Sequence, residues 1–385
     1  MADENKVIII GAGIGGLSLA VGLRRNGVAS SIHECRPEVA ELGTGTGIQR
    51  VAQQGLEMLG LGESLRDVAG QPFEALLLKS YKAGRPMASI PRRGEAFVVH
   101  HGELLEVLKR ALGDLSLIRC NSECVGFEQD GNGVIARFAD GTTDRGAVLV
   151  GADGVRSVVR AQIVDDGPPL YSSQIAWRGM PVYTHPTLPS DISEQVWGPK
   201  TIFGMFPCGE RLFWWASDVR PEGQADPPGG RKQDLLATFG DWPEGIPQVI
   251  EATPEEQIYR GDVYHRMPVK SWRQGLATLL GDAAHPTMPA FGQGAGMAIE
   301  DAAVLSGELS AVSDLSDAVA LGAALERYEQ RRIPRTSAIV NRARRMSKLC
   351  TWKSAPALVL REAMLRAVPE SVWLRTYEHE HTYQL

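Results

Sequence analysis

The sequence lacks the features that mark several large classes of protein. Its five cysteines are scattered and form no Cys-x-x-Cys pair, which argues against a disulfide framework and against a metal site. It contains no run of about 18 apolar residues, so we expect no membrane span. The formal net charge is −6 without a block of like charges, so nucleic acid is not an expected partner. The acidic, polar start is unlike a signal peptide, and we expect a reducing, cytoplasmic location.

Glycine is the one residue type in excess, with 42 in 385 residues, and this suits a fold with close backbone approaches to a ligand. The length favours two lobes around a large core. From about Tyr171 to Asp262, tryptophans, prolines and alternating patterns predict an antiparallel sheet with long loops. The tail from Ala324 onward is predicted to be helical and basic. We interpret it as a solvated face, with contact to a membrane or nucleic acid as the alternative.

The chain opens with the pattern strand, glycine-rich turn, helix, strand. Val7–Ile10 is a β-branched run typical of a buried parallel strand, and Gly11–Gly16 (GAGIGG) follows it directly. The glycines of such a turn permit the bend, the approach of a pyrophosphate and the packing of the helix, whose N-terminus attracts the phosphates. Glu34, at the end of the second strand, can accept hydrogen bonds from ribose hydroxyls and would repel a 2′-phosphate. This segment predicts a dinucleotide site and by itself does not separate FAD from NAD.

A second motif turns this prediction toward a flavin. A predicted buried strand at 276–280 leads to Gly281-Asp282, a loop with prolines follows, and Gly292–Gly294 opens an apolar helix. The N-terminus of that helix could stabilise the negative charge of a reduced flavin. Asp282, at the strand end, could accept a hydrogen bond from a hydroxyl of the ribityl chain. The glycines are not a second dinucleotide turn, because prolines rather than a strand precede them.

Two further segments, Gly151–Ser157 (GADGVRS) and Ala176–Gly179 (AWRG), complete a pattern that covers nearly the whole chain. In order and spacing the motifs resemble those of the class A flavoprotein monooxygenases, the p-hydroxybenzoate and salicylate hydroxylase family. The resemblance implies an α/β fold: a Rossmann-like FAD-binding domain of the glutathione-reductase type, an inserted, mainly antiparallel β-sheet substrate domain, and C-terminal helices. We assign residues 1–73, 98–170 and 262–345 to the FAD-binding domain, 74–97 and 171–261 to the substrate domain, and 346–385 to a C-terminal helical segment.

The resemblance also implies an activity. Such enzymes hold FAD non-covalently, are reduced by NADH or NADPH as a transient partner, and form a flavin C4a-hydroperoxide with O2. One oxygen atom is then inserted into a small aromatic or heteroaromatic substrate. The alternative activity is epoxidation of an olefinic or isoprenoid intermediate. Two less favoured alternatives are a flavin-dependent reductase and a non-catalytic FAD-binding protein. We expect a monomer or homodimer whose partners are a small-molecule substrate and O2.

The cofactor residues come partly from the two glycine-rich motifs and partly from the resemblance. The predicted FAD-binding residues are Gly11, Gly13, Gly15, Gly16, Glu34, Cys35, Gly47, Ile48, His101, Cys124, Asp153, Asp282, Pro289, Gly292, Gly294 and Ala295. Asp153 has an alternative role as the cap of a helix that starts at Val155.

Two departures from the family pattern stand out. His101 takes the place of an arginine that reaches the cofactor, and it can donate a hydrogen bond without supplying a permanent charge. Ala52-Gln53 replaces the usual Pro-Asn, which alters the loop between flavin and substrate.

Candidates for a catalytic base are few, although a phenol substrate would benefit from one. His185, His265 and Gln49 are the candidates, and none is assigned; His285 is interpreted as a packing residue of the Gly281-Asp282 loop. The predicted substrate wall comprises Arg50, Met205, Phe213 and Trp215. For the tryptophans an ordinary sheet core is the alternative, and for Arg50 an exposed position at the loop edge.

Overall fold

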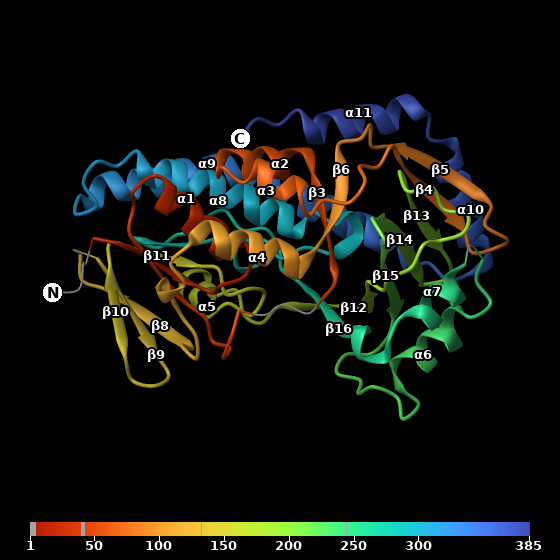
Figure 1. Cartoon of the computed structure of the whole chain (residues 1–385), viewed down its shortest axis with the longest axis horizontal. Coiled ribbons are helices and arrows are strands. Elements are labelled where there is room, and N and C mark those ends of the chain that lie inside the picture. Colours follow the sequence, from red (N-terminus) through yellow and green to blue (C-terminus); the bar gives the residue numbers. More distant parts are fainter. Residues whose placement is uncertain (1–4, 40–42, 132, 244) are drawn as a thin grey trace.

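The structure is a computed structural model that describes residues 5–39, 43–131, 133–243 and 245–385. Residues 1–4, the first part of the acidic start, therefore lie outside the described residues. Figure 1 shows an elongated molecule, with a parallel sheet and its helices towards one end and a large, mainly antiparallel sheet at the other.

A parallel sheet forms the core of the first lobe. Its five described strands lie in the order β17-β11-β1-β2-β7, and every neighbouring pair is parallel. Their bounds are β1 Val7–Ile10, β2 Ser30–His33, β7 Ile118–Arg119, β11 Val148–Gly151 and β17 Ala277–Leu279. All residues of β1 and β11 are buried, as their β-branched and apolar composition predicts for strands covered on both faces.

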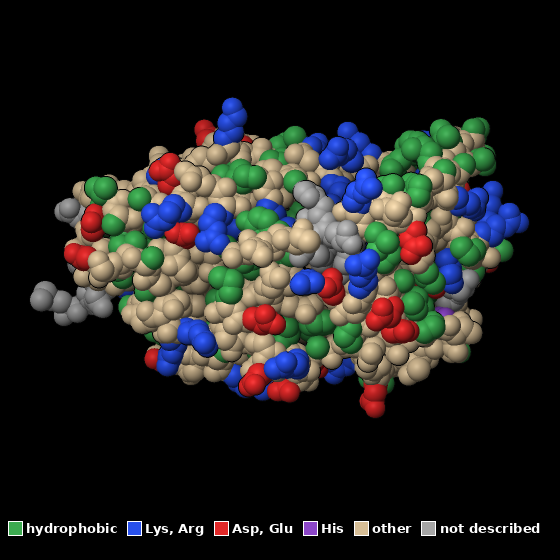
Figure 2. Space-filling model, turned by 90° about the horizontal axis from the view of Figure 1, so that it is seen from above, with side chains coloured by type: hydrophobic (Ala, Val, Ile, Leu, Met, Phe, Trp, Pro, Cys, Tyr) green, Lys and Arg blue, Asp and Glu red, His purple; other side chains and the backbone are tan. Residues whose placement is uncertain are grey.

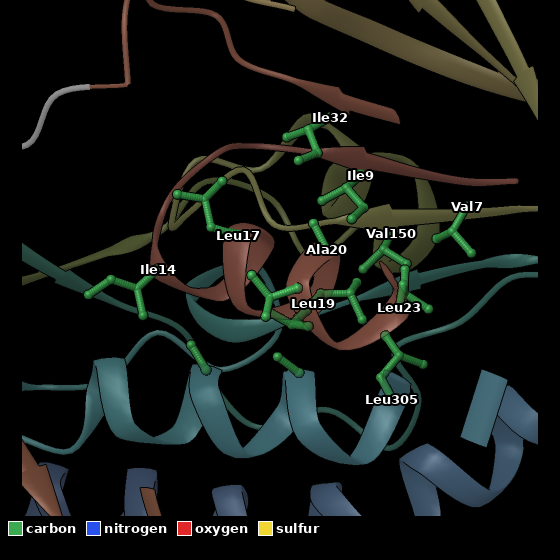
Figure 3. Close-up of a cluster of buried hydrophobic side chains, with 14 of the residues drawn as sticks. Val7, Ile9, Ile14, Leu17, Leu19, Ala20, Leu23, Ile32, Val150 and Leu305 are labelled. Carbon is green, nitrogen blue, oxygen red and sulfur yellow. The ribbon is translucent and has the colours of Figure 1, made fainter. Parts of the chain in front are cut away.

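Helix α1 (Ile14–Arg25) is buried between this sheet and helix α8 (Gly294–Ser310). Figure 3 shows how its apolar side chains divide between the two sides: Leu17 and Ala20 lie toward the strands, near Ile9 and Ile32, and Leu305 of α8 closes the opposite side. Helix α8 is apolar around most of its circumference, which fits a helix in the centre of a lobe.

The second lobe is built on a seven-stranded sheet in the order β16-β12-β15-β14-β13-β4-β5. Its pairs are antiparallel except β13–β4, which is parallel, so the predicted antiparallel sheet is observed with one exception. The bounds are β4 Ala75–Ser80, β5 Pro86–Pro91, β12 Leu170–Gly179, β13 Ile192–Trp197, β14 Ile202–Cys208, β15 Arg211–Val219 and β16 Tyr259–His265. One face packs on helices α6 (Gly230–Phe239) and α7 (Ile246–Ala252) through Trp177, Phe203 and Trp214.

Smaller elements complete the first lobe and connect it to the second. A three-stranded antiparallel sheet lies beside β1, and the pair β3–β6 with helix α4 lies between the lobes (Figure 1). The strands are β3 Gly45–Gln49, β6 Ala96–His100, β8 Cys124–Gln129, β9 Val134–Phe138 and β10 Thr143–Gly146. The helices are α2 Arg50–Met58, α3 Gly62–Arg66, α4 His101–Leu112 and α5 Val158–Val164, and the short 3-10 turns are η1 Leu115–Leu117, η2 Glu255–Gln257, η3 Gly281–Ala283 and η4 Pro289–Phe291.

The C-terminal part is helical, as predicted, and it contacts both lobes. Helix α9 (Ala318–Cys350) packs on α8, while α10 (Ala355–Ala367) and α11 (Glu370–His381) lie against β5. Because α9 continues to residue 350, the predicted boundary at 345/346 falls inside a helix. Among the described residues, the structure contains no helix whose length and apolar character would suit a membrane span.

The interpretation of the basic tail as a solvated face is wrong for its central arginines. Arg332 is fully buried, with its guanidinium bound to Glu300 and Asp301 of α8, and Arg335 binds Glu300 as well. The tail arginines thus neutralise acids of the buried helix. On the face seen in Figure 2, Lys and Arg side chains are interspersed with Asp and Glu, in keeping with the lack of like-charge blocks in the sequence.

Candidate functional site

The glycine-rich turn after β1 is shaped by contacts that leave no room for side chains. Gly11 has a φ of +106°, and a Cβ there would lie 2.4 Å from the carbonyl oxygen of Ala152. A Cβ on Gly16 would lie 2.0 Å from the carbonyl oxygen of Gly11, so this glycine allows α1 to start directly beneath the turn. Gly13, in contrast, has open space on its Cβ side and lines a cavity. The turn therefore offers its backbone to a ligand at the start of α1.

Glu34 follows β2 and is fixed across the turn. Its carboxylate accepts hydrogen bonds from the backbone N–H of Ala12 at 2.9 Å and of Arg36 at 3.0 Å. The side chain lines the same cavity as Gly13. A carboxylate held at this place can accept hydrogen bonds from ribose hydroxyls, which is the role predicted for it.

Two cavities adjoin in the structure. The first, of about 450 Å³, runs along the glycine-rich turn and Glu34, and the second, of about 320 Å³, lies between the lobes. The residues that line both are His101, Asp282, Gly294 and Ala295. The N-terminus of α8 therefore stands where the cavities meet, with its first N–H groups unpaired within the helix.

Asp282 lies at this meeting point, directly after a backbone turn that a glycine makes. The preceding Gly281 has a φ of +62° and donates its N–H to Asp301 at 3.0 Å. The Asp282 side chain is accessible from the cavity and otherwise surrounded by protein, and this burial raises the pKa of its carboxyl. Nearby His285 and Arg178 oppose that shift.

Asp301 connects the loop that carries Asp282 to two helices. Its carboxylate binds Nε2 of His285 at 2.5 Å and Nε of Arg332 at 2.6 Å. Burial opposes the ionisation of Asp301, but His285 and Arg332 outweigh it and lower the pKa of its carboxyl. His285 is itself buried beside Trp272, which agrees with its interpretation as a packing residue.

His101 begins helix α4 at the other side of the meeting point. Its backbone N–H donates to the carbonyl of Thr44 at 2.7 Å, and its Nδ1 is buried without a hydrogen-bond partner among the residues that the structure describes. Burial, aided by Arg178 and His100, lowers the pKa of His101 to about 4. The ring is therefore neutral at pH 7 and has one nitrogen available to a ligand.

Asp153 caps a helix and also reaches the first cavity. Its Oδ2 accepts from the N–H groups of Val158 at 2.8 Å and Val159 at 3.4 Å, so it caps α5, which starts at Val158 and not at Val155 as predicted. Within the described part of the chain its Oδ1 is buried and has no hydrogen-bond partner, and the residue lines the cavity. The cap is thus observed, and a role at a cofactor remains a prediction.

The second cavity is lined by aromatic and by polar side chains. Phe73, Phe206, Phe213 and Trp215 form the aromatic wall. The cavity is also lined by polar side chains on several elements: Gln49, Arg92, Arg178, Ser193, Gln195 and Gln293. Gln293 donates to Gln49 at 2.7 Å, and Gln49 donates to the carbonyl of Phe291 at 3.1 Å, so this part of the wall is fixed by hydrogen bonds.

Nearly all of the predicted cofactor residues line the two cavities. Gly11, Gly13, Gly15, Glu34, Cys35, Cys124 and Asp153 line the first, Gly47, Ile48, Pro289 and Gly292 line the second, and His101, Asp282, Gly294 and Ala295 line both. Gly16 lines neither, because its role is the close packing of α1 beneath the turn.

The substrate wall and the base candidates are placed less well. Phe213 and Trp215 line the second cavity, but Met205 does not: it packs beside Trp214 in the core on the other face of the sheet. Side chains alternate along a strand, so its neighbour Phe206 faces the cavity instead. Arg50 is half exposed and pairs with Glu95 outside both cavities.

Of the base candidates, only Gln49 lines a cavity. His185 is buried in the second lobe, where its Nδ1 accepts from the backbone N–H of Leu188 at 2.9 Å. His265 ends β16, away from both cavities, and burial together with Arg344 lowers its pKa. Neither histidine is placed to act on a ligand there.

Sequence reasoning missed Arg178, Phe206 and Ser122. Arg178 lies within the Ala176–Gly179 motif, and its alternation with buried Trp177 could have indicated that it faces the opposite side of β12. Ser122 has no local signal, because it reaches the first cavity only through the pairing of β7 with β2.

The first cavity fits FAD by the chemistry of its walls. Its glycines leave backbone exposed to the cavity, and Glu34 supplies a fixed acceptor. Asp153 and His101 each keep one buried polar atom that no described residue satisfies. A dinucleotide with phosphate, hydroxyl and amide groups can satisfy these groups along its length.

Comparison with known proteins agrees with this. Residues 4–343 match a family model described as an FAD binding domain. The chain is 38% identical to an aurachin C monooxygenase/isomerase of Stigmatella aurantiaca, over 94% of this chain and 93% of that one. It is 31% identical to a 3-amino-4-hydroxybenzoate 2-monooxygenase of Streptomyces cremeus, over 97% and 95%. The crystal structure of a variant of Klebsiella pneumoniae HpxO complexed with FAD superposes with a TM-score of 0.87 at 25% identity, over 98% of both chains.

Proposed function

Because this chain belongs to the class A family of FAD-dependent monooxygenases, we propose that it hydroxylates a small aromatic or heteroaromatic compound with one atom of O2, and that NADH or NADPH supplies the electrons. The meeting of the two cavities at the N-terminus of α8 carries the proposal. An elongated cofactor cradle and a compact cavity with an aromatic wall then share one boundary, at which a ring system and a substrate can face each other.

The same proposal gives each lobe a role. The first lobe acts as a Rossmann-like FAD-binding domain of the glutathione-reductase type, and the second covers the substrate. The parallel strand order around β1 and the position of the turn at the start of α1 support this division. Strands β6, β12 and β16 cross the predicted limits at 97/98, 170/171 and 261/262, so we move these limits to the strand ends.

Bound FAD would supply the redox chemistry that connects a nicotinamide donor to O2. The residues of this chain bind, orient and shield it. Gly13 and the start of α1 would bind the phosphates, and Glu34 would accept hydrogen bonds from the ribose hydroxyls. At the shared boundary the first N–H groups of α8 favour negative charge on the reduced ring. Beside these N–H groups, Asp282 would accept a hydrogen bond from a hydroxyl of the ribityl chain.

The second cavity favours a planar substrate with polar edges. Phe206, Phe213 and Trp215 offer ring faces and edges for stacking, and Gln195 and Arg178 face the same space. Arg178 adds a permanent positive charge that stabilises an electron-rich anion, such as a phenolate. Aromatic hydroxylation is easier on an ionised phenol, so this charge can replace a dedicated base in raising the reactivity of the substrate.

A substrate screen tests the proposal. The purified protein should carry or take up FAD, and a phenolic or heteroaromatic compound should accelerate NADH or NADPH oxidation and gain one oxygen from labelled O2 in its mass spectrum. Stimulation only by an isoprenoid olefin would favour the epoxidase alternative. NAD(P)H oxidation that always ends in hydrogen peroxide, without product, would contradict a monooxygenase role on the compounds tested.

A further inference from the structure

The first cavity contains a hydroxyl whose orientation is set by buried side chains behind it. Ser122 lines the cavity next to Glu34, and its backbone N–H donates to the carbonyl of Glu34 at 2.8 Å. Its Oγ lies 2.9 Å from Nδ1 of His33. His33, on β2, is 1% exposed and stacks on Phe138 with ring centroids 4.2 Å apart, so the imidazole has no freedom to turn away.

The other nitrogen of His33 faces a carboxylate. Nε2 lies 2.9 Å from Oδ2 of Asp144, which also accepts from Oγ of Ser31 at 2.6 Å and, through Oδ1, from Nζ of Lys6 at 2.7 Å. Burial opposes the ionisation of Asp144, but these three hydrogen bonds outweigh it and lower the pKa of its carboxyl well below the usual range. An ionised carboxylate only accepts, so the proton of the neutral imidazole must be on Nε2.

This fixes the direction of the next hydrogen bond. With its proton on Nε2, the neutral ring has only a lone pair on Nδ1, and Ser122 must donate its hydroxyl hydrogen to it. The serine hydroxyl, which is ordinarily both donor and acceptor, then has only lone pairs left for the cavity. Asp144 thus acts through His33 to make Ser122 an acceptor.

The position of Ser122 indicates which part of a dinucleotide it meets. The phosphates belong at the start of α1 and the ribose at Glu34, so the base lies farther along, beyond Glu34. The segment around Ser122 is held there by two backbone bonds to the strand end: Ser122 to Glu34, and Asn121 to Arg36 at 2.9 Å. Adenine has an amino group at position 6, which donates, whereas hypoxanthine has a carbonyl oxygen there, which accepts.

We propose that Ser122, positioned by His33 and Asp144, accepts a hydrogen bond from the 6-amino group of the adenine of FAD and rejects purines with an oxygen at that position. The inference rests on the placement of FAD in the first cavity proposed above. It assigns a base-reading function to a hydroxyl at the distal end of the cradle, far from the ring that does the chemistry.

The test compares FAD with its analogue in which hypoxanthine replaces adenine. Apoprotein is titrated with each ligand at pH 8.5, and binding is followed by flavin fluorescence. The wild-type protein should bind FAD about tenfold more tightly than the analogue, the effect of one matched against one mismatched hydrogen bond. Ser122→Ala should lose most of this preference, because the variant binds FAD more weakly.

A second variant separates positioning from contact. His33→Phe keeps the stacking on Phe138 but leaves the Ser122 hydroxyl to rotate, so it can donate to the analogue. Binding of FAD should change less than about threefold, while binding of the analogue tightens and the preference falls. A loss of packing alone would weaken the binding of FAD and of the analogue to the same extent. Ser116→Ala is the matched control, because that hydroxyl is exposed, binds Asp114 and lies outside the cavity.

The outcomes distinguish this inference from the cofactor placement. If Glu34→Ala weakens both ligands while Ser122→Ala keeps the wild-type preference, the placement stands and the base-reading role is wrong. Equal binding of FAD and analogue by the wild-type protein also overturns it. If Glu34→Ala leaves both affinities unchanged, the placement of FAD along this cavity is wrong, and the inference is wrong with it.

Discussion

Nε2 of His285 lies 2.5 Å from Oδ2 of Asp301, and Nε of Arg332 occupies the other oxygen of the same carboxylate at 2.6 Å. All three side chains are buried. The cluster joins the loop that carries Asp282 to α8 and α9, and it does so without reaching either cavity. The boundary between the two cavities is thus supported from behind by a buried cluster that lines neither of them.

Asp301→Asn should destabilise the protein strongly. The change removes the negative charge but leaves the guanidinium of Arg332 fully buried with Glu300 as its remaining acid, and breaking a buried ion pair on one side costs about 3–5 kcal/mol. Thermal or urea unfolding of the apoprotein measures the loss. Glu63→Gln, at a side chain that is 96% exposed, should change the free energy of unfolding by less than about 0.5 kcal/mol. Equal stabilities for the two variants would show that the cluster does not stabilise the fold.

Gly16→Ala should abolish FAD binding because it displaces the glycine-rich turn, and not because a contact with FAD is lost. A Cβ at this position would lie 2.0 Å from the carbonyl oxygen of Gly11, so α1 must move away from β1. Retention of FAD after desalting is the measurement. The control is Gly307→Ala on α8, where a Cβ meets nothing within 4 Å and the helix should gain about 0.5–1 kcal/mol. Full FAD retention by Gly16→Ala would mean that the turn tolerates the displacement.

These glycines show what could be predicted from the sequence. The turn, the helix after it and Glu34 are close in the chain, so their geometry follows from local rules of strand, turn and helix. The Gly281-Asp282 loop could be predicted in the same way, because a strand delivers it and a helix follows. The predicted cofactor residues therefore line the cavities with the single exception of Gly16.

The residues that were misplaced or missed depend on relationships that no local pattern contains. Met205 and Phe206 are neighbours on one strand, and one packs in the core while the other lines the cavity. An error of one residue in the alternation of side chains therefore assigns the wrong one of them to the cavity. Ser122 reaches the cavity only because β7 pairs with β2, and Asp144, which acts on it through His33, comes from a different sheet. Arg332 was interpreted as solvated because its acidic partners lie 31 and 32 positions earlier, on another helix.

His101 should make the stability of the apoprotein depend on pH. Its folded pKa of about 4 lies below the ordinary value of 6.5, so the unfolded chain takes up a proton first as the pH falls. The contribution of His101 to the free energy of unfolding is fully present above pH 6.5 and is lost as the pH falls toward 4. The loss is on the order of 3 kcal/mol. Unfolding midpoints of wild type and His101→Gln between pH 7 and 4 measure it. The variant should lose less stability over this interval, and parallel curves would contradict the assignment.

Neighbouring residues on β14 should separate substrate binding from core packing. Phe206→Ala removes a ring from the cavity wall, so KM for an aromatic substrate should rise about tenfold or more through the loss of stacking and apolar contact. Met205→Ala, one residue away, opens a hole in the core beside Trp214 and should cost about 2–5 kcal/mol of stability, with KM nearly unchanged in the folded fraction. Steady-state kinetics and thermal unfolding of both variants test the pair. A raised KM for Met205→Ala, or an unaltered one for Phe206→Ala, would place the substrate on a different wall, because only the alternation of side chains along this strand distinguishes the two positions.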